Sequence, residues 1–171
     1  MPLKLLRFAT ILLVALLTGL AFAHVLEQPA KMQYGPDLYI GLQQSLYVQW
    51  GPPNIGGVLE PMAIAATALL AFFARKTRPE SLFYLGALFA LLLAFPVVFF
   101  WLVAPANSVF LTTVLPDIPS NWAEQRSNWE IGHTIRFGLQ LVALALLVLP
   151  LTLGLRPTTV TSEPGPGDIQ P

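Results

Sequence analysis

The chain has 171 residues, of which 55% are hydrophobic and only 11% are charged. This is more apolar surface than a soluble domain of that size can bury, so the composition predicts a protein that lies in a lipid bilayer. The nine basic and nine acidic residues cancel, which gives no basis for binding nucleic acid. The chain contains no cysteine, which excludes disulfides, thiolate metal sites and thiol redox chemistry.

Four stretches are long and apolar enough to cross a membrane as helices. They run over residues 5–26, 58–74, 82–104 and 131–155. Pro96 and Pro150 lie inside the third and fourth spans, where each removes a backbone donor and is expected to kink its helix. We therefore expect an all-α fold, an integral membrane four-helix bundle over residues 1–156. Residues 157–171, rich in Pro, Gly, Ser and Thr, are expected to form a disordered cytoplasmic tail.

Lysine and arginine are concentrated at one end of the predicted helices. Lys4 and Arg7 precede the first span, three basic residues lie between positions 75 and 78, and Arg156 follows the fourth span. Cytoplasmic loops contain such an excess of basic residues. We therefore expect both termini to face the cytoplasm, with a bacterial inner membrane as the location.

The first span also has features of a cleaved signal peptide. Its apolar run follows Lys4 and Arg7 and ends in Ala21-Phe22-Ala23, an A-x-A cleavage pattern. Cleavage would leave His24 as a free N-terminus. The run is long for a signal peptide, and the topology with four spans explains the basic residues better, so we favour an uncleaved span.

The loop after the first span is expected to contain an interfacial helix over residues 37–50. Leucines recur along one side of it, and aromatic residues suited to the lipid headgroup level lie elsewhere on it. These residues are Leu38, Leu42 and Leu46, and Tyr39, Tyr47 and Trp50.

The helix that leads into the fourth span has a stripe of polar and aromatic residues. At about 100° per residue, seven of them fall within an arc of roughly 120°. They are Trp122, Arg126, Trp129, Glu130, His133, Arg136 and Gln140. Charged groups at membrane depth are costly unless they pair inside a bundle, so the stripe is expected to face inward.

Other polar residues are expected at the same outer end of the bundle. His24 and Glu27 end the first span, Glu60 begins the second, and Asn107 follows the third. With both termini in the cytoplasm, all of them lie at a depth similar to that of the stripe. Their convergence predicts a polar site near the outer membrane face.

Three interpretations of this cluster remain open. Glu130-x-x-His133 has the spacing of metal-ligand pairs in helix bundles, and iron, manganese, zinc or copper would suit the two imidazoles and three carboxylates. The candidate ligands are His24, Glu27, Glu60, Glu130 and His133. Alternatively, the carboxylates pair with Lys31, Arg126 and Arg136 and only stabilise helix packing. The third interpretation is a catalytic or ligand-binding pocket without a metal, in which His133 is the residue best suited to proton transfer.

Several segments resemble a family of small membrane proteins. They are Ala23–Lys31 (AHVLEQPAK), Gln43–Tyr47 (QQSLY) and the pattern Trp122-x-x-x-Arg126-x-x-Trp129-Glu130-x-x-His133-x-x-Arg136. Together they are similar to the four-span proteins grouped with the anthrone oxygenases, many members of which have no assigned function. The resemblance extends from the first span to the fourth and implies the same fold.

The resemblance implies oxidation of an anthrone to an anthraquinone by dioxygen, without a dissociable organic cofactor. It implies that His133 or His24 is the base and that Arg126 or Arg136 stabilises the oxyanion. The expected substrate-binding residues are Trp122, Trp129, Glu130, Gln140, Asn107 and Tyr47. The cofactor is then either none or a bound metal ion.

The expected function is thus a membrane oxygenase for a lipophilic aromatic or quinone-like molecule, with the bilayer and that molecule as its partners. The alternative is a structural, accessory or small-molecule-binding membrane protein in which the His, Glu and Arg residues form an ion-pair network. Substitution of His24 and His133 by alanine distinguishes them, since an enzyme would lose turnover and a structural network would lose stability. The sequence does not define the oligomeric state.

Overall fold

A computed structural model of the chain describes residues 2–76 and 80–154. Within these ranges all regular structure is helical. The elements are α1 (Pro2–Lys31), α2 (Pro36–Ser45), η1 (Tyr47–Gln49), α3 (Ile55–Phe73), α4 (Glu80–Leu92), η2 (Leu93–Val103), α5 (Ala104–Thr112) and α6 (Trp122–Thr152). The predicted tail, 157–171, lies outside the described residues.

Four helices in the described part of the chain are long and apolar enough to cross a membrane: α1, α3, α6 and the continuous rod of α4, η2 and α5. This confirms the predicted all-α class and the four apolar helices. All four helices are longer than the predicted spans, α3 by only two residues. The first continues past Leu26 and through Pro29 to Lys31, and the last begins at Trp122 and passes through Pro150.

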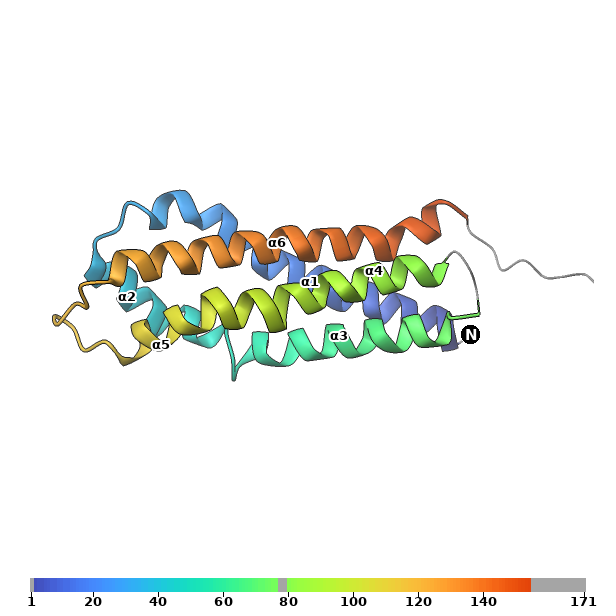
Figure 1. The fold of residues 1–171 in the computed structure, drawn as a ribbon, viewed down its shortest axis with the longest axis horizontal. Coiled ribbons are helices and arrows are strands. Elements are labelled where there is room, and N and C mark those ends of the chain that lie inside the picture. Colours follow the sequence, from blue (N-terminus) through green and yellow to red (C-terminus); the bar gives the residue numbers. More distant parts are fainter. Residues whose placement is uncertain (1, 77–79, 155–171) are drawn as a thin grey trace, which may run out of the picture.

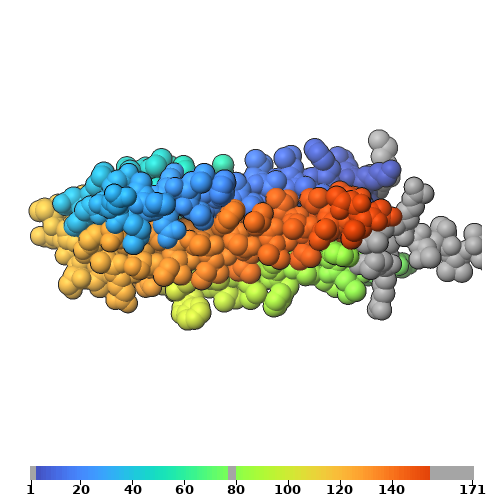
Figure 2. Space-filling model, turned by 90° about the horizontal axis from the view of Figure 1, so that it is seen from above, coloured from blue at the N-terminus to red at the C-terminus, as the bar shows by residue number. Residues whose placement is uncertain are grey.

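The helices pack side by side in the cyclic order α1, α6, α4, α3 (Figure 1). Their common core in the half of the molecule near the N-terminus is apolar and includes Leu17, Leu70, Tyr84 and Leu147. Figure 2 shows α1 and α6 lying together along the length of an elongated molecule. The outward faces expose large apolar side chains such as Trp101, which is 74% exposed. Lipid, unlike water, accommodates such faces without cost.

Pro96 lies in η2, a π-helical stretch of 11 residues that joins α4 to α5. Because proline has no N–H group and its ring displaces the carbonyl one turn earlier, regular α-helical bonding cannot continue past it. The backbone adopts wider turns at this point instead of ending the helix. This stretch lies at the level of the polar residues described below.

The segment α2–η1 folds back over the outer end of the long helices, which is the end opposite the N-terminus (Figure 1). It buries Tyr39 and Tyr47 and exposes Leu38 and Leu46. The tyrosine hydroxyl groups bond to the carboxylates of Glu130 and Glu27, and the position of these tyrosines at the headgroup level stays a prediction. Helix α2 also ends at Ser45, earlier than predicted. The Gln44 amide fastens the segment by donating to two carbonyl oxygens near the end of α5, at 2.8 and 2.7 Å.

Candidate functional site

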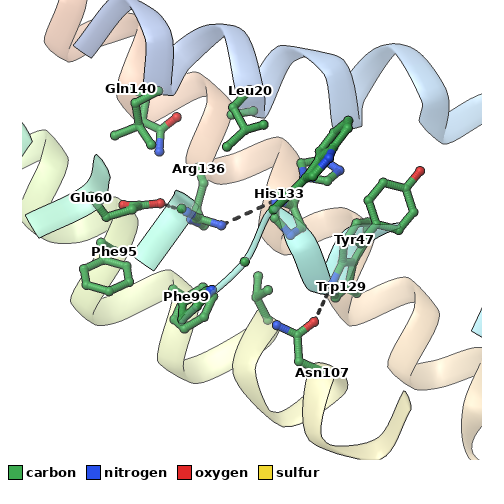
Figure 3. Close-up of a pocket in the computed structure, with 18 residues that line it drawn as sticks. Leu20, Tyr47, Glu60, Phe95, Phe99, Asn107, Trp129, His133, Arg136 and Gln140 are labelled. Carbon is green, nitrogen blue, oxygen red and sulfur yellow. Dashed lines mark hydrogen bonds and ion pairs between the residues drawn. The ribbon is translucent and has the colours of Figure 1, made fainter. Parts of the chain in front are cut away.

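A cavity of about 50 Å³ lies between the outer halves of the long helices (Figure 3). From Trp129 to Gln140 its wall on α6 extends over about 16 Å, at 1.5 Å per residue. The residues that line it come from α1, η1 and the turn after it, α3, η2, α5 and α6. They are Leu17, Leu20, Ala21, His24, Tyr47, Trp50, Gly51, Pro52, Gly56, Glu60, Phe95, Phe99, Val103, Asn107, Trp129, His133, Arg136 and Gln140.

Two imidazole rings lie together in this cavity. The ring centroids of His24 on α1 and His133 on α6 are 4.1 Å apart, and both side chains are buried. The indole of Trp129 packs against both rings, with centroid distances of 5.0 Å to His24 and 4.1 Å to His133. The indole N–H donates to Asn107 Oδ1 at 2.8 Å, which fixes its orientation. Trp50 adds a further aromatic wall, 5.4 Å from His24.

Arg136 lies between Glu60 and His133 (Figure 3). One terminal nitrogen forms an ion pair with the Glu60 carboxylate, and the other, Nη1, lies 3.4 Å from Nδ1 of His133. Its guanidinium carbon lies 5.2 Å from the centre of the Phe99 ring. A buried positive charge is thus compensated by a carboxylate and by an aromatic face while it contacts the imidazole.

The deepest polar residue of the cavity is Gln140, whose side chain has no exposed surface. Neither its amide nitrogen nor its amide oxygen has a hydrogen-bond partner among the described residues. Nδ1 of His24 is likewise without a partner in that part of the chain. Buried polar groups are nearly always hydrogen-bonded to protein or water. Three polar side-chain atoms without such a partner around one cavity therefore indicate a site for a small polar group.

A second polar layer lies between the cavity and the outer surface. Lys31 is only 2% exposed, and its Nζ lies 3.3 Å from Glu130 and 3.9 Å from Glu27. The same nitrogen lies 4.5 Å from the centre of the Trp129 ring and 4.9 Å from that of Tyr47. Two carboxylates and two aromatic faces therefore compensate the charge of the buried ammonium group.

Two tyrosines of the outer segment complete this layer. The Tyr39 hydroxyl donates to Glu130 at 2.9 Å, and the Tyr47 hydroxyl donates to Glu27 at 2.6 Å. Burial raises the pKa of Tyr39 above its usual range, and the nearby negative charge of Glu130 raises it further. Burial also raises the pKa of Tyr47, with a second contribution from its bond to Glu27. Both phenols are therefore hydrogen-bond donors at neutral pH.

The structure brings together eight of the predicted site residues around the cavity: His24, Tyr47, Glu60, Asn107, Trp129, His133, Arg136 and Gln140. Glu27 and Glu130 belong to the outer layer instead. Arg126 and Trp122 lie apart from the cavity. The Arg126 guanidinium donates to the carbonyl oxygens of residues 32 and 34 and stacks 4.6 Å from the Trp122 ring, so this pair ties α6 to the chain after α1.

The five predicted metal ligands do not converge on one point. Within the described ranges, no three His, Asp or Glu side chains are grouped closely enough to hold a metal ion. Each carboxylate of the set pairs with a basic side chain, Glu60 with Arg136 and both Glu27 and Glu130 with Lys31. The two imidazoles remain as adjacent donors at the cavity.

Sequence reasoning did not select five residues that build the site: Lys31, Tyr39, Trp50, Phe95 and Phe99. The sequence indicates Lys31 only as an ion-pair partner, because the predicted first span ends at Leu26. Its spacing of seven residues from His24 places both on one face of an uninterrupted helix, which is a signal that could have found it. Phe95 and Phe99 are indistinguishable by sequence from other phenylalanines of an apolar span.

Comparison of the chain with protein-family models, with curated proteins and with solved structures finds no match in any of the three. The chemistry of the site is therefore interpreted from the chain's own residues. The resemblance to the anthrone oxygenases stays a prediction.

Proposed function

We propose that this chain is a membrane-embedded oxygenase that oxidises a lipophilic aromatic molecule, anthrone-like or quinone-like, with dioxygen. The observation that supports this best is the contact between His24 and His133, with ring centroids 4.1 Å apart, beside the Arg136 guanidinium and inside aromatic walls. Such a reaction needs a base to take the proton, a fixed positive charge to stabilise the oxyanion, and apolar surroundings that exclude water.

The proposed setting is a four-helix bundle that crosses a bacterial inner membrane with both termini in the cytoplasm and α2 at the outer surface. The basic residues near the ends of α1 and α3 support this orientation. Exposed Leu38 and Leu46 support contact of the α2–η1 segment with the lipid surface. Helix α1 packs along α6 and α3 and forms one wall of the cavity, which supports its retention as an uncleaved span.

For an anthrone, the proposed reaction consumes one dioxygen and releases one water. His133 or His24 takes a proton from the carbon opposite the carbonyl, and the carbanion passes an electron to dioxygen. The two radicals combine to form a C–O bond, and the resulting peroxide anion takes the proton back from the imidazolium to give a hydroperoxide. Loss of the second proton from that carbon breaks the O–O bond, expels hydroxide and leaves a carbonyl, and the hydroxide takes up a proton to become water. One oxygen atom of dioxygen is then in the anthraquinone and the other in water.

Arg136, rather than Arg126, is the proposed stabiliser of the developing oxyanion. Arg136 lines the cavity, whereas Arg126 donates to backbone carbonyl oxygens outside it. The free amide of Gln140 offers a second donor for an oxygen atom of the substrate. Fixed donors of this kind stabilise charge that develops in a transition state in a site that excludes water.

The test is turnover of anthrone by the protein in lipid nanodiscs, followed as dioxygen consumption and as anthraquinone absorbance. We expect His133→Ala to lower the rate by a factor of about 10² to 10⁴, because a general base contributes that much. Arg136→Gln should also lose turnover, whereas Arg126→Gln on the same helix should retain it. A wild-type protein that is folded but oxidises neither anthrone nor an alkyl quinol would contradict the proposal.

A metal-dependent route is tested on the same samples. Elemental analysis of the wild type and of the His24→Ala, His133→Ala double variant measures bound iron, manganese, zinc and copper. A near-stoichiometric metal that is lost in the folded double variant would assign both imidazoles as ligands. Turnover without stoichiometric metal would support direct reaction of the substrate carbanion with dioxygen.

A structural or accessory role is the second candidate, favoured by the ion pairs that join α1, α3 and α6. Glu60 on α3 pairs with Arg136 on α6, and Lys31 on α1 pairs with Glu130 on α6. Under this alternative, substitutions in these pairs lower stability and no substrate is turned over. Retained turnover in a folded Lys31→Met variant with lowered stability would assign the outer layer to packing and the cavity to catalysis.

A further inference from the structure

The cavity is too small for the substrate of the proposed function, on which this inference rests. Its volume is about 50 Å³, whereas a buried cavity that binds benzene has about 150 Å³. It can hold dioxygen or a few water molecules but no aromatic ring. A ring can reach the imidazoles only if one wall moves, and the packing around the cavity differs greatly from wall to wall.

Hydrogen bonds hold the outer wall of the cavity in place. Segment α2–η1 covers it, and hydrogen bonds join Tyr39 to Glu130 at 2.9 Å and Tyr47 to Glu27 at 2.6 Å. Gln44 adds two bonds to the end of α5. Opening this wall would break these bonds and leave the buried Lys31–Glu130 pair exposed or unpaired, at a cost that makes it a poor route for an apolar ring.

The inner wall is filled by the apolar core of α1, α3, α4 and α6. Its side chains include Val14, Leu70, Leu91 and Leu147, each at most 2% exposed. Helix α6 also packs closely against both α1 and η2, and α1 packs against α3. At Gly132, the position before His133, a Cβ atom would lie 2.7 Å from the Val103 side chain. The backbone of α6 therefore packs directly against a side chain of η2 at this point.

The remaining wall is the seam between α3 and η2. Helix α3 packs against α1 and α4 but makes only marginal contact with η2. One side of the seam is formed by Pro52, Gly56 and Glu60, and the other by four residues that recur at every fourth position. These are Phe95, Phe99, Val103 and Asn107. Both sides line the cavity, so the cavity is bounded here by two elements that pack little against each other.

The two phenylalanines of the seam differ in how firmly they are held. Phe99 is 7% exposed and lies under the Arg136 guanidinium. Phe95 is only half-buried, and its ring centroid lies 5.3 Å from that of Phe99. It is followed by Pro96, in the π-helical backbone of η2, where regular helical hydrogen bonding is interrupted. Phe95 is thus less buried than Phe99, and its second aromatic neighbour is the exposed Phe100, with ring centroids 5.7 Å apart.

We propose that a lipophilic ring reaches the imidazoles sideways from the bilayer, between α3 and η2, and that the Phe95 side chain is the gate. The substrate class is then a molecule dissolved in the membrane, such as a quinone or hydroquinone with an alkyl tail, in which the ring enters the cavity and the tail remains in lipid. The polar group of the ring would meet Arg136 and Gln140, which lie beyond the gate.

The experiment measures the binding of a benzoquinone with a decyl tail to the protein in nanodiscs, through quenching of Trp50 and Trp129. Trp101→Phe and Trp122→Phe remove the two other tryptophans. Because the chain has no cysteine, Phe95→Cys and Phe100→Cys each introduce a single thiol, which is labelled with a membrane-soluble benzyl thiosulfonate. Phe100 is the matched control, since it is 60% exposed and does not line the cavity.

We expect the label at position 95 to slow quenching at least tenfold and the label at position 100 to leave it unchanged. Phe95→Ala, which removes the gate without a label, should accelerate quenching. At a fixed total quinone concentration, the quenching rate should fall as lipid is added. Entry from the bilayer makes this rate depend on the mole fraction of quinone in the membrane, which added lipid lowers. Quenching that the label at position 95 does not affect would overturn the gate while leaving the proposed function intact. A folded wild-type protein whose tryptophans the quinone does not quench would overturn this inference, whereas turnover of anthrone or an alkyl quinol tests the proposed function separately.

Discussion

Nη1 of Arg136 lies 3.4 Å from Nδ1 of His133, one turn earlier on the same helix. A guanidinium group can only donate, so this contact makes Nδ1 an acceptor and leaves the proton of the neutral imidazole on Nε2. We predict that ¹⁵N spectra of histidine-labelled protein show His133 in the Nε2–H tautomer. Arg136→Met should convert it to a mixture of tautomers. An unchanged tautomer in that variant would mean that another group orients the ring.

The Glu60–Arg136 pair is expected to contribute to stability mainly through the penalty of separating it. Arg136→Met leaves the Glu60 carboxylate buried without its partner, which should lower the free energy of unfolding by about 3–5 kcal/mol. The double variant Glu60→Met, Arg136→Met should recover much of this loss. Reversible unfolding in mixed micelles with increasing SDS, followed by circular dichroism, measures all three variants. A double variant with the summed loss of the two single variants would show that the two residues are not coupled.

Two glycines of α6 should respond in opposite ways to alanine. At Gly132 a Cβ atom would lie 2.7 Å from Val103 and 3.1 Å from Leu102, so Gly132→Ala should push α6 away from η2 and destabilise the protein by about 1–3 kcal/mol. At Gly138 nothing lies within 4 Å of such an atom, and alanine favours the helix by up to about 1 kcal/mol. Thermal unfolding in detergent should therefore show a lower midpoint for the first variant and an equal or higher one for the second.

The buried tyrosines predict a loss of stability at high pH. Because the folded state raises the pKa of Tyr39 and Tyr47, an unfolded chain releases these protons near pH 10 while the folded chain keeps them. The free energy of unfolding should thus be independent of these groups below about pH 9 and fall as the pH rises above about 10. The Tyr39→Phe, Tyr47→Phe double variant should lack this part of the decrease. Absorbance at 295 nm checks it directly, since folded wild type and variant should ionise the same number of phenols up to about pH 11.

The fold was largely predictable because the long apolar stretches leave only helices as membrane-compatible structure. Helix ends were predicted less well, since apolar length marks the lipid core and not the end of the helix. Helix α1 continues to Lys31 through Pro29, and α6 begins at Trp122. These extensions contain residues of the outer polar layer. Because the predicted spans end before them, the prediction missed that part of the site.

The candidate site was predictable to the extent that residues share one helix face. Trp129, His133, Arg136 and Gln140 all line the cavity, as expected from their spacing on α6. Glu130 has metal-ligand spacing relative to His133, yet it turns to Tyr39 and Lys31. The orientation of the Glu130 side chain depends on its partners on α1 and α2. Residue spacing within α6 cannot predict these partners. The same limit applies to the phenylalanines of η2, because a π-helical stretch changes which residues share a face.

The apolar core below Gln140 also determines how the site can exchange protons. In the described residues between Gln140 and the Arg7–Glu80 pair, the buried hydroxyl groups of Thr18 and Thr67 bond to carbonyl oxygens of their own helices. They offer no relay toward the end of the bundle that holds the N-terminus, whereas Tyr47 and Glu27 connect the cavity region to the outer layer. A proton taken up or released at His133 would then return to the side from which it came. Turnover would move no net charge across the membrane, and its rate would not respond to the membrane potential.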